Sequence, residues 1–195
     1  MARPRKFDED AVVGAARDQF WDGGYAATSV DDLTAATGLG KGSLYGAFGD
    51  KHTLFLRALD DYCVDATGRV VAQLQRPGVS AYDRLADHVR AVAADIASDI
   101  GRRGCMMAKS AAELGANDAD VGQLINASFA KWQSALADCI AEAQRDGMVS
   151  AATDPEALAT MLLGMIRGFE ALRMGGVEPA RIVAAAEQAL TFVAG

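Results

Sequence analysis

The side chains with the clearest capacity for chemistry lie in the first third of the sequence. Lys41, Ser43 and Tyr45 stand within five residues of one another, with Gly42 between the first two and Gly46 directly after Tyr45. Ammonium and hydroxyl groups donate hydrogen bonds to phosphate oxygens and base edges, and glycine lets a backbone approach a partner closely. The pattern therefore indicates a surface that binds a nucleic acid rather than a site that breaks covalent bonds.

Two short helices must position these side chains. Ser29 and Asp32 form a capping-box pattern at the start of the first helix, and residues 38–40 supply a glycine-containing turn. Leu44 and Phe48, four residues apart, share one side of the second helix. The length of the turn and its glycine content are typical of a helix-turn-helix.

The opposite side of the second short helix is expected to enter a major groove. Each glycine lowers helix stability by about 1 kcal/mol relative to alanine, so its presence there needs a reason, and close approach to DNA supplies one. Lys41 and Ser43 are expected to reach base edges, and the flanking residues to reach phosphates. The predicted DNA-binding residues are Thr28, Lys41, Gly42, Ser43, Tyr45, Gly46, Lys51 and His52.

Residues 8–55 resemble the DNA-binding domain of the TetR (tetracycline-repressor) family. The motif runs without a gap from Gly38 to Tyr45, and Phe48, Lys51 and Leu54 follow at the family spacing. The resemblance implies an all-α fold, in which a three-helix helix-turn-helix domain precedes a ligand-binding and dimerisation domain of roughly six helices. It also implies a homodimer that binds a palindromic operator on double-stranded DNA, usually as a repressor, until a small-molecule effector releases it.

By this resemblance, five residues occupy positions that touch DNA in relatives: Thr28, Lys41, Ser43, Tyr45 and Lys51. Three positions depart from the family pattern. Gly40 replaces a serine that often caps the recognition helix, Gly46 replaces a larger side chain that commonly reaches DNA, and Thr34 replaces a packing alanine. The operator sequence and the affinity for it are therefore not implied.

Capping residues and glycines predict six further helices, over residues 50–74, 80–100, 105–116, 117–147, 154–175 and 178–195. A helix is also predicted ahead of the two short ones, from the capping residue Asp8 to Gly23, which makes nine helices in all. We place a domain boundary near residue 50, which gives a DNA-binding domain over 1–50 and a ligand-binding and dimerisation domain over 51–195.

The formal net charge of -7 argues against DNA binding through an overall positive charge. Residues 1–51 alone do not change this, because they hold 6 Lys+Arg against 8 Asp+Glu. Arg3, Arg5 and Lys6 cluster just before the helix predicted from Asp8.

Apolar stripes on the last two helices predict a four-helix dimer interface. Its expected residues are Met161, Gly164, Gly168, Leu172, Val183, Ala186 and Leu190. Packing of both stripes inside one subunit is the alternative. Residues of the fourth to eighth helices are expected to line a site for a small apolar molecule, although core packing is the better explanation for any one of them taken singly. The candidates are Cys105, Met106, Lys109, Phe129, Trp132, Met165 and Phe169.

Two other functions remain open at this stage. Cys105 follows Arg102 and Arg103 at a helix start, where a thiolate is stabilised, so it could sense an oxidant or electrophile instead of lying buried. A helical protein that has lost DNA binding is the second. No cofactor, metal site or catalytic arrangement is expected, and Lys109 with Glu113 is interpreted as an intrahelical pair. The three separated cysteines and the absence of a long apolar run favour the cytoplasm.

Overall fold

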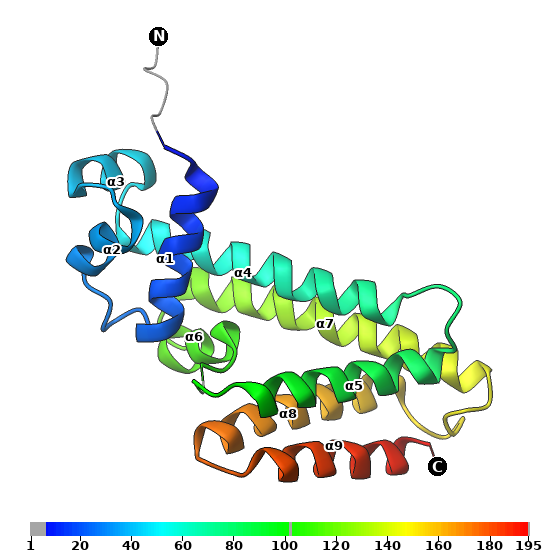
Figure 1. Cartoon of the computed structure of the whole chain (residues 1–195). Coiled ribbons are helices and arrows are strands. Elements are labelled where there is room, and N and C mark those ends of the chain that lie inside the picture. The colour runs from blue at the N-terminus through cyan, green and yellow to red at the C-terminus, as the bar shows by residue number, and fades with distance from the viewer. Residues whose placement is uncertain (1–6, 102, 195) are drawn as a thin grey trace. The chain divides into compact units, whose positions relative to one another are not determined.

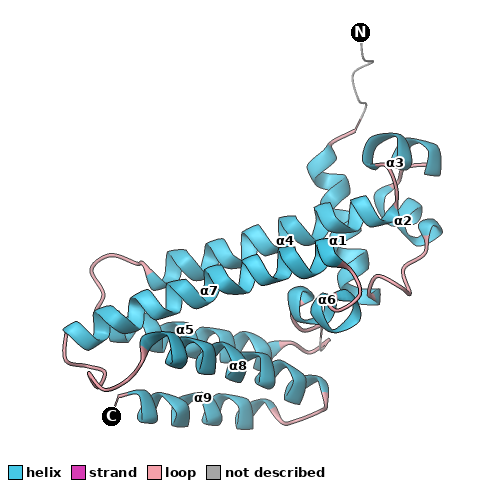
Figure 2. Cartoon of the chain, turned by 180° about the vertical axis from the view of Figure 1, so that it is seen from behind, coloured by secondary structure: helices cyan, strands magenta, loops and turns pink. Residues whose placement is uncertain are grey.

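The computed structural model describes residues 7–101 and 103–194, and every regular element within them is an α-helix (Figure 1, Figure 2). Arg3, Arg5, Lys6 and Arg102 lie outside the described residues. None of the described helices combines the length and apolar content needed to cross a membrane. The helices are α1 Glu9–Gly23, α2 Val30–Thr37, α3 Lys41–Phe48, α4 Lys51–Leu74, α5 Ala81–Ser98, α6 Met106–Leu114, α7 Ala119–Arg145, α8 Pro155–Met174 and α9 Pro179–Val193.

Side-chain caps begin several of these helices, which confirms the element order predicted from the sequence. The Asp8 carboxylate accepts hydrogen bonds from two backbone amides in the first turn of α1. Ser29 and Asp32 form both halves of the capping box at α2, and Asp154 caps α8 ahead of Pro155. Each cap satisfies amides that lack a partner within the helix, which is typically worth about 1 kcal/mol.

Packing divides the described chain into two compact units. Unit 1 contains the residues up to Val64 together with Met106–Ile125, and unit 2 contains Asp65–Cys105 and the residues from Asn126 onward. The chain therefore passes between the units three times, within α4, just before α6 and within α7. The functional boundary near residue 50 remains a prediction, because these units describe packing and not the extent of a binding surface.

Unit 1 is built around the contact of α1 with α2 and of α2 with α3. Phe20 of α1 and Phe55 of α4 are buried, and their ring centroids lie 5.1 Å apart in an edge-to-face arrangement. Such a pair contributes about 0.5–1.5 kcal/mol beyond the burial of its apolar area. The Arg17 guanidinium, 2.8 Å from the Asp61 carboxylate, joins α1 to α4 at the rim of this core.

Unit 2 packs α5 against α8 and α9, and Figure 1 and Figure 2 both show α5, α8 and α9 side by side. The Arg90 guanidinium binds both carboxylate oxygens of Glu187 at 2.8 and 3.0 Å, and the Tyr82 hydroxyl donates to the Leu190 carbonyl. These pairs show that α5 and α9 run antiparallel. The helix predicted over residues 80–100 ends earlier, at Ser98, so Ile100 lies beyond the end of α5 and is exposed.

Candidate functional site

The turn between α2 and α3 holds the two helices at a fixed angle. Gly38 ends α2 with a φ of 67°, in the left-handed region that favours glycine. Leu33 of α2 and Leu44 of α3 are completely buried, and Phe48 at the end of α3 is buried beside the Phe7 ring. The apolar side of each helix thus faces the core of unit 1, as their spacing predicts.

The outer side of α3 carries very little side-chain bulk. Lys41, Gly42, Ser43 and Gly46 are exposed, and Tyr45 is half-buried. A Cβ atom added at Gly42 or Gly46 would meet no heavy atom within 4 Å. Packing within the protein therefore explains neither glycine, and the backbone of α3 is open to a partner along this side.

The start of α3 also matches the sequence interpretation. Gly40 occupies the N-cap position and makes no side-chain hydrogen bond there, so the first turn of α3 keeps amide groups available. The Lys41 Nζ lies 5.8 Å from the centroid of the Tyr45 ring, which places a cation beside a phenol on the same edge of the helix. These are hydrogen-bond donors suited to phosphate or to base edges.

Thr28 has a structural role that the sequence did not indicate. Its side chain is buried, with only 2% of the residue exposed, and its hydroxyl donates to the Gly24 carbonyl at 2.7 Å. This bond satisfies a carbonyl just after α1, next to the start of α2. Because this hydroxyl is buried and already bonded, we correct the prediction that the Thr28 side chain contacts DNA.

The first turn of α4 holds two predicted phosphate contacts, and their surroundings differ. The Lys51 Nζ lies 4.3 Å from the centroid of the Tyr25 ring and remains half-buried. The His52 Nε2 lies 2.7 Å from Asp118 Oδ2. The pKa of Asp118 is lowered, first by the hydrogen bond from the Val121 amide and then by His52. Because its ring already binds a carboxylate, His52 is also omitted from the proposed interface.

Contacts from α6 join it to the segment between α1 and α2. The Lys109 ammonium donates to the Trp21 carbonyl at 2.5 Å, and the Glu113 carboxylate accepts from the Tyr25 and Ala26 amides at 3.0 and 2.7 Å. The expected intrahelical pair is therefore replaced by three hydrogen bonds to backbone groups, and both side chains bind within unit 1. We call these bonds the α6 anchor contacts. Sequence reasoning missed them because the partners are 87 and 88 residues apart.

Most of the predicted effector-binding residues fall in one unit. Cys105, Phe129, Trp132, Met165 and Phe169 belong to unit 2, whereas Met106 and Lys109 belong to unit 1. Trp132, Phe169 and Met106 are buried, and Phe129 and Met165 are half-buried. Cys105 is 7% exposed, so a soluble oxidant has little access to its sulfur.

A chain of buried hydrogen bonds crosses unit 2 from α7 to α4. The Trp132 Nε1–H donates to His88 Nε2 at 3.2 Å, and His88 Nδ1 lies 2.9 Å from Gln73 Oε1. Because Nε2 accepts, neutral His88 carries its proton on Nδ1 and donates it to Gln73. Burial, with a smaller contribution from the Arg167 charge, lowers the pKa of His88 to about 4, so this ring is neutral at pH 7.

Arg167 and Glu170 of α8 add charge to the same buried region. The Arg167 guanidinium carbon lies 4.8 Å from the centroid of the Trp132 ring, and Arg167 Nη1 lies 3.0 Å from Glu170 Oε2. Burial raises the pKa of Glu170 to about 7, against the opposing effect of Arg167. The sequence analysis overlooked this pair, although two charges three residues apart in an otherwise apolar stripe could have revealed it.

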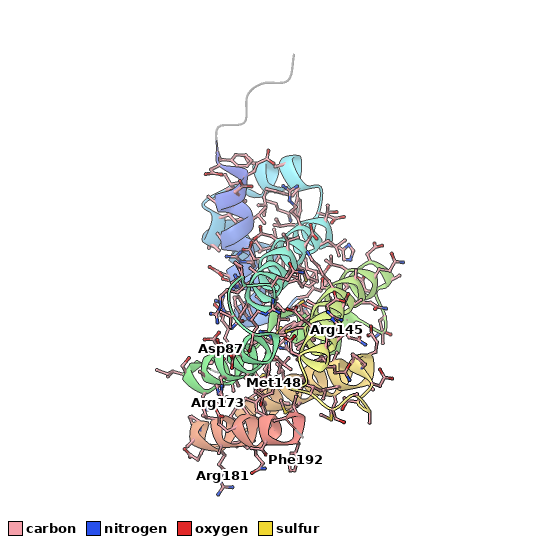
Figure 3. All side chains as sticks on the ribbon, turned by 90° about the vertical axis from the view of Figure 1, so that its right-hand side faces the viewer. Asp87, Arg145, Met148, Arg173, Arg181 and Phe192 are labelled. Carbon is pink, nitrogen blue, oxygen red and sulfur yellow. The ribbon has the colours of Figure 1, made fainter. Side chains whose placement is uncertain are left out.

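The free sides of α8 and α9 present apolar and small residues to the surface. Met161, Gly164, Gly168, Leu172 and Val183 are exposed, as expected for residues that a second subunit would cover. Ala186 and Leu190 are 1% and 3% exposed because they pack inside the same chain, which corrects their place in the predicted interface. Phe192 of α9, marked in Figure 3, was not predicted and is 77% exposed.

Family models match the chain over most of its length. The model described as bacterial regulatory proteins of the tetR family matches residues 12–58, and the tetracyclin repressor-like C-terminal domain matches residues 81–188. The chain belongs to the TetR family. The repressor ComR of Escherichia coli strain K12 is 32% identical over 167 residues, which cover 86% of this chain and 80% of ComR.

Solved structures agree with this assignment. A cysteine mutant of the TetR family regulator CifR, complexed with 26-bp double-strand operator DNA, has a TM-score of 0.82 and 30% identity over 97% of this chain and 98% of CifR. Reduced NemR of E. coli has a TM-score of 0.83 at 14% identity over 95% of this chain and 97% of NemR, and that similarity concerns the fold alone. This TetR-family protein is a DNA-binding transcriptional regulator and not an enzyme.

Proposed function

We propose that this TetR-family protein binds a palindromic operator as a homodimer and represses transcription until a small molecule binds unit 2. The observation that carries the proposal is the open side of α3, where a Cβ added at either exposed glycine would meet no heavy atom within 4 Å and where Lys41 and Ser43 lie beside them. A backbone that is bare and rich in donors suits a groove about 12 Å wide. The protein would act in the cytoplasm, where bacterial DNA lies.

The proposed contacts with DNA divide by chemistry. Lys41 and Ser43, at the start of α3, would reach base edges, and Tyr45 and Lys51 would reach phosphates. With Lys51 as the lysine assigned to phosphate in a chain of net charge -7, each subunit would make few charged phosphate contacts. Because each phosphate contact contributes about -0.9 to the slope of log K against log salt, we expect a shallow salt dependence for this protein.

The proposed dimer is supported by the exposed apolar residues of α8 and α9. Gly164 and Gly168 are exposed and have no neighbour within 4 Å of an added Cβ, so a helix from a second subunit could approach closely there. Met161, Leu172 and Phe192 would supply the apolar area. A two-fold dimer would present two copies of α3 to half-sites about 34–36 Å apart.

Release by an effector would use the three places where the chain passes between the units. A ligand that binds unit 2 better in one conformation shifts the population toward it. The α6 anchor contacts of Lys109 and Glu113, and the pairing of His52 with Asp118, tie α6 and the start of α7 to the helix-turn-helix within unit 1. A displacement of α6 or α7 would therefore change the separation of the two copies of α3.

The test is a titration of purified protein against a fluorescent duplex taken from the DNA that flanks its own coding sequence. Gly46→Glu places bulk and negative charge on the open side of α3, and we expect it to abolish binding in low salt. Gly68→Glu is the matched control, because Gly68 is an exposed helical glycine of α4 with equal open space around it. Binding of Gly46→Glu as tight as the wild type would contradict the proposal.

The same titration separates the two remaining alternatives. A protein that has lost DNA binding would leave every duplex free in low salt. A regulator that senses oxidants or electrophiles through Cys105 would no longer release the duplex in response to them once Cys105 is replaced with serine. The burial of Cys105 does not favour this alternative.

A further inference from the structure

Arg167 is a cation in a largely buried position. Its side chain is 18% exposed, and its guanidinium lies over the face of Trp132. Arginine stays protonated in proteins, so burial cannot be relieved by loss of the proton. A buried cation is destabilising unless a counter-charge and well-aligned hydrogen bonds compensate for the lost water.

The compensation given by Glu170 is incomplete. Arg167 Nη1 and Glu170 Oε2 lie 3.0 Å apart, yet neither atom, nor Arg167 Nε, has an aligned hydrogen-bond partner among the described residues. The pKa of Glu170 near 7 means that its carboxyl group is partly protonated at neutral pH. The positive charge of Arg167 is then only partly neutralised, and two of its nitrogens, Nε and Nη1, are buried without an aligned acceptor.

The other groups around this pair do not supply the missing negative charge. His88 is neutral and uses both ring nitrogens, toward Trp132 and Gln73. The Asp99 carboxylate raises the pKa of Glu170, and its Oδ2 accepts a hydrogen bond from the Gly104 amide at 2.7 Å. Asp99 thus favours protonation of Glu170, which leaves the guanidinium still less neutralised.

We propose that the effector is a small organic acid, whose carboxylate binds Arg167 and whose hydrocarbon part lies against Trp132. The donors of a guanidinium are spaced to bind two carboxylate oxygens at once, and the indole ring gives an apolar surface beside them. This inference rests on the proposed response to a small molecule and narrows its chemical class. An acid with an apolar tail replaces the wholly apolar effector expected from the sequence.

The experiment is calorimetric titration of the full-length protein without DNA. The probes are the sodium salts of acetic, butanoic, hexanoic and octanoic acids, and each is compared with its primary amide, which has the same shape and no charge. We expect at least one acid to bind ten times more tightly than its amide. Equal binding of acid and amide, or no binding of any acid at millimolar concentrations by folded protein, would overturn the proposal.

Variants separate recognition from a structural role. Arg167→Gln should remove the preference for the acid, and Arg167→Lys should keep only part of it because lysine lacks the paired donors. Glu170→Gln should tighten acid binding several-fold, since it removes the competing carboxylate, whereas a purely structural pair predicts weaker binding. Arg145→Gln is the control, since Arg145 is an exposed arginine of α7 in the same unit (Figure 3).

The outcomes also distinguish this inference from the proposed function. If an acid binds but does not release the operator, the ligand class stands and the release mechanism fails. If only molecules without an acid group release the operator, the release mechanism stands and the ligand class is wrong. If Arg167→Gln does not fold, the comparison of acid with amide and the effect of Glu170→Gln still test whether the site recognises a carboxylate.

Discussion

Two helices of this protein, α3 and α8, carry the same backbone feature in different surroundings. Each has two glycines four residues apart, Gly42 with Gly46 and Gly164 with Gly168, and all four are exposed with open space where a Cβ would stand. Glycine in a helix costs about 1 kcal/mol relative to alanine. Neither helix gains packing inside the chain from these residues, and two glycines one turn apart leave its backbone open to a partner on that side.

The neighbours of the glycines indicate which partner. On α3 they are Lys41, Ser43 and Tyr45, which donate hydrogen bonds, whereas on α8 they are Met161 and Leu172, which are apolar. A polar, donor-rich surface suits DNA, and an apolar one suits a second copy of the chain. We infer that close backbone approach serves both proposed interfaces, and that the flanking side chains select the partner at each.

The largest expected effect comes from placing a charge on the apolar surface. Gly168→Glu would bury an unpaired carboxylate in the proposed dimer, which costs several kcal/mol and weakens dimerisation by roughly a thousandfold. Operator affinity should fall by about a hundredfold or more, because a monomer binds only one half-site. Sedimentation measures the first effect, and Gly68→Glu is again the control. A variant that stays fully dimeric would break the comparison at α8.

A smaller loss is expected when the donor at the start of α3 is removed. Lys41→Ala should weaken operator binding by about 1–3 kcal/mol and relax the preference at one base pair if the ammonium contacts a base edge. A uniform loss across sequences, with the salt slope reduced by about 1, would instead identify a phosphate contact. The control is Lys131→Ala, at an exposed lysine of α7. Unchanged affinity would remove Lys41 from the interface.

A third change tests the glycines of α3 directly. Gly42→Ala should raise the free energy of unfolding by about 0.5–1 kcal/mol, since an added Cβ meets nothing in the protein. Operator affinity should nevertheless fall about tenfold, because the methyl group separates the backbone from the groove. Gly68→Ala should give the same gain in stability with no loss of affinity. A more stable variant that binds DNA normally would show that close approach is not needed at Gly42.

The smallest effect concerns the α6 anchor contacts inside unit 1. Glu113→Gln keeps a similar shape but replaces charge-assisted bonds to the Tyr25 and Ala26 amides with neutral ones. We expect a loss of about 0.5–1 kcal/mol in stability and a two- to threefold change in operator affinity. Thermal unfolding and the duplex titration measure these effects. If the response to an effector is fully retained, the α6 anchor contacts do not transmit it.

Local sequence signals predicted the helices well because each signal acts on its own neighbourhood. Ser29 with Asp32 fixes where α2 begins, and the spacing of Leu44 and Phe48 fixes which side of α3 is buried. On α9 the same reasoning failed for Ala186 and Leu190. Apolar residues lie on more than one side of that helix, so periodicity could not separate the side facing α5 from the side open to a partner.

Long-range polar contacts gave no sequence signal at all. His52 meets Asp118 across 66 residues, and Lys109 meets a carbonyl of α1 across 88. These bonds depend on how the chain returns to unit 1 through α6, which no local pattern records. The contact of Arg167 with Trp132, which joins α8 to α7 inside unit 2, has no local sequence signal either. The helices and their buried sides were therefore predicted more reliably than the long-range partners of individual side chains.

The central claim, that the open side of α3 meets DNA, is tested most directly by hydrogen exchange with and without operator duplex. The account predicts slower exchange in peptides that cover residues 41–48, at a protein concentration where the dimer is already formed and peptides from α8 do not change. Unchanged exchange over residues 41–48 on a protein that is saturated with DNA would contradict the account.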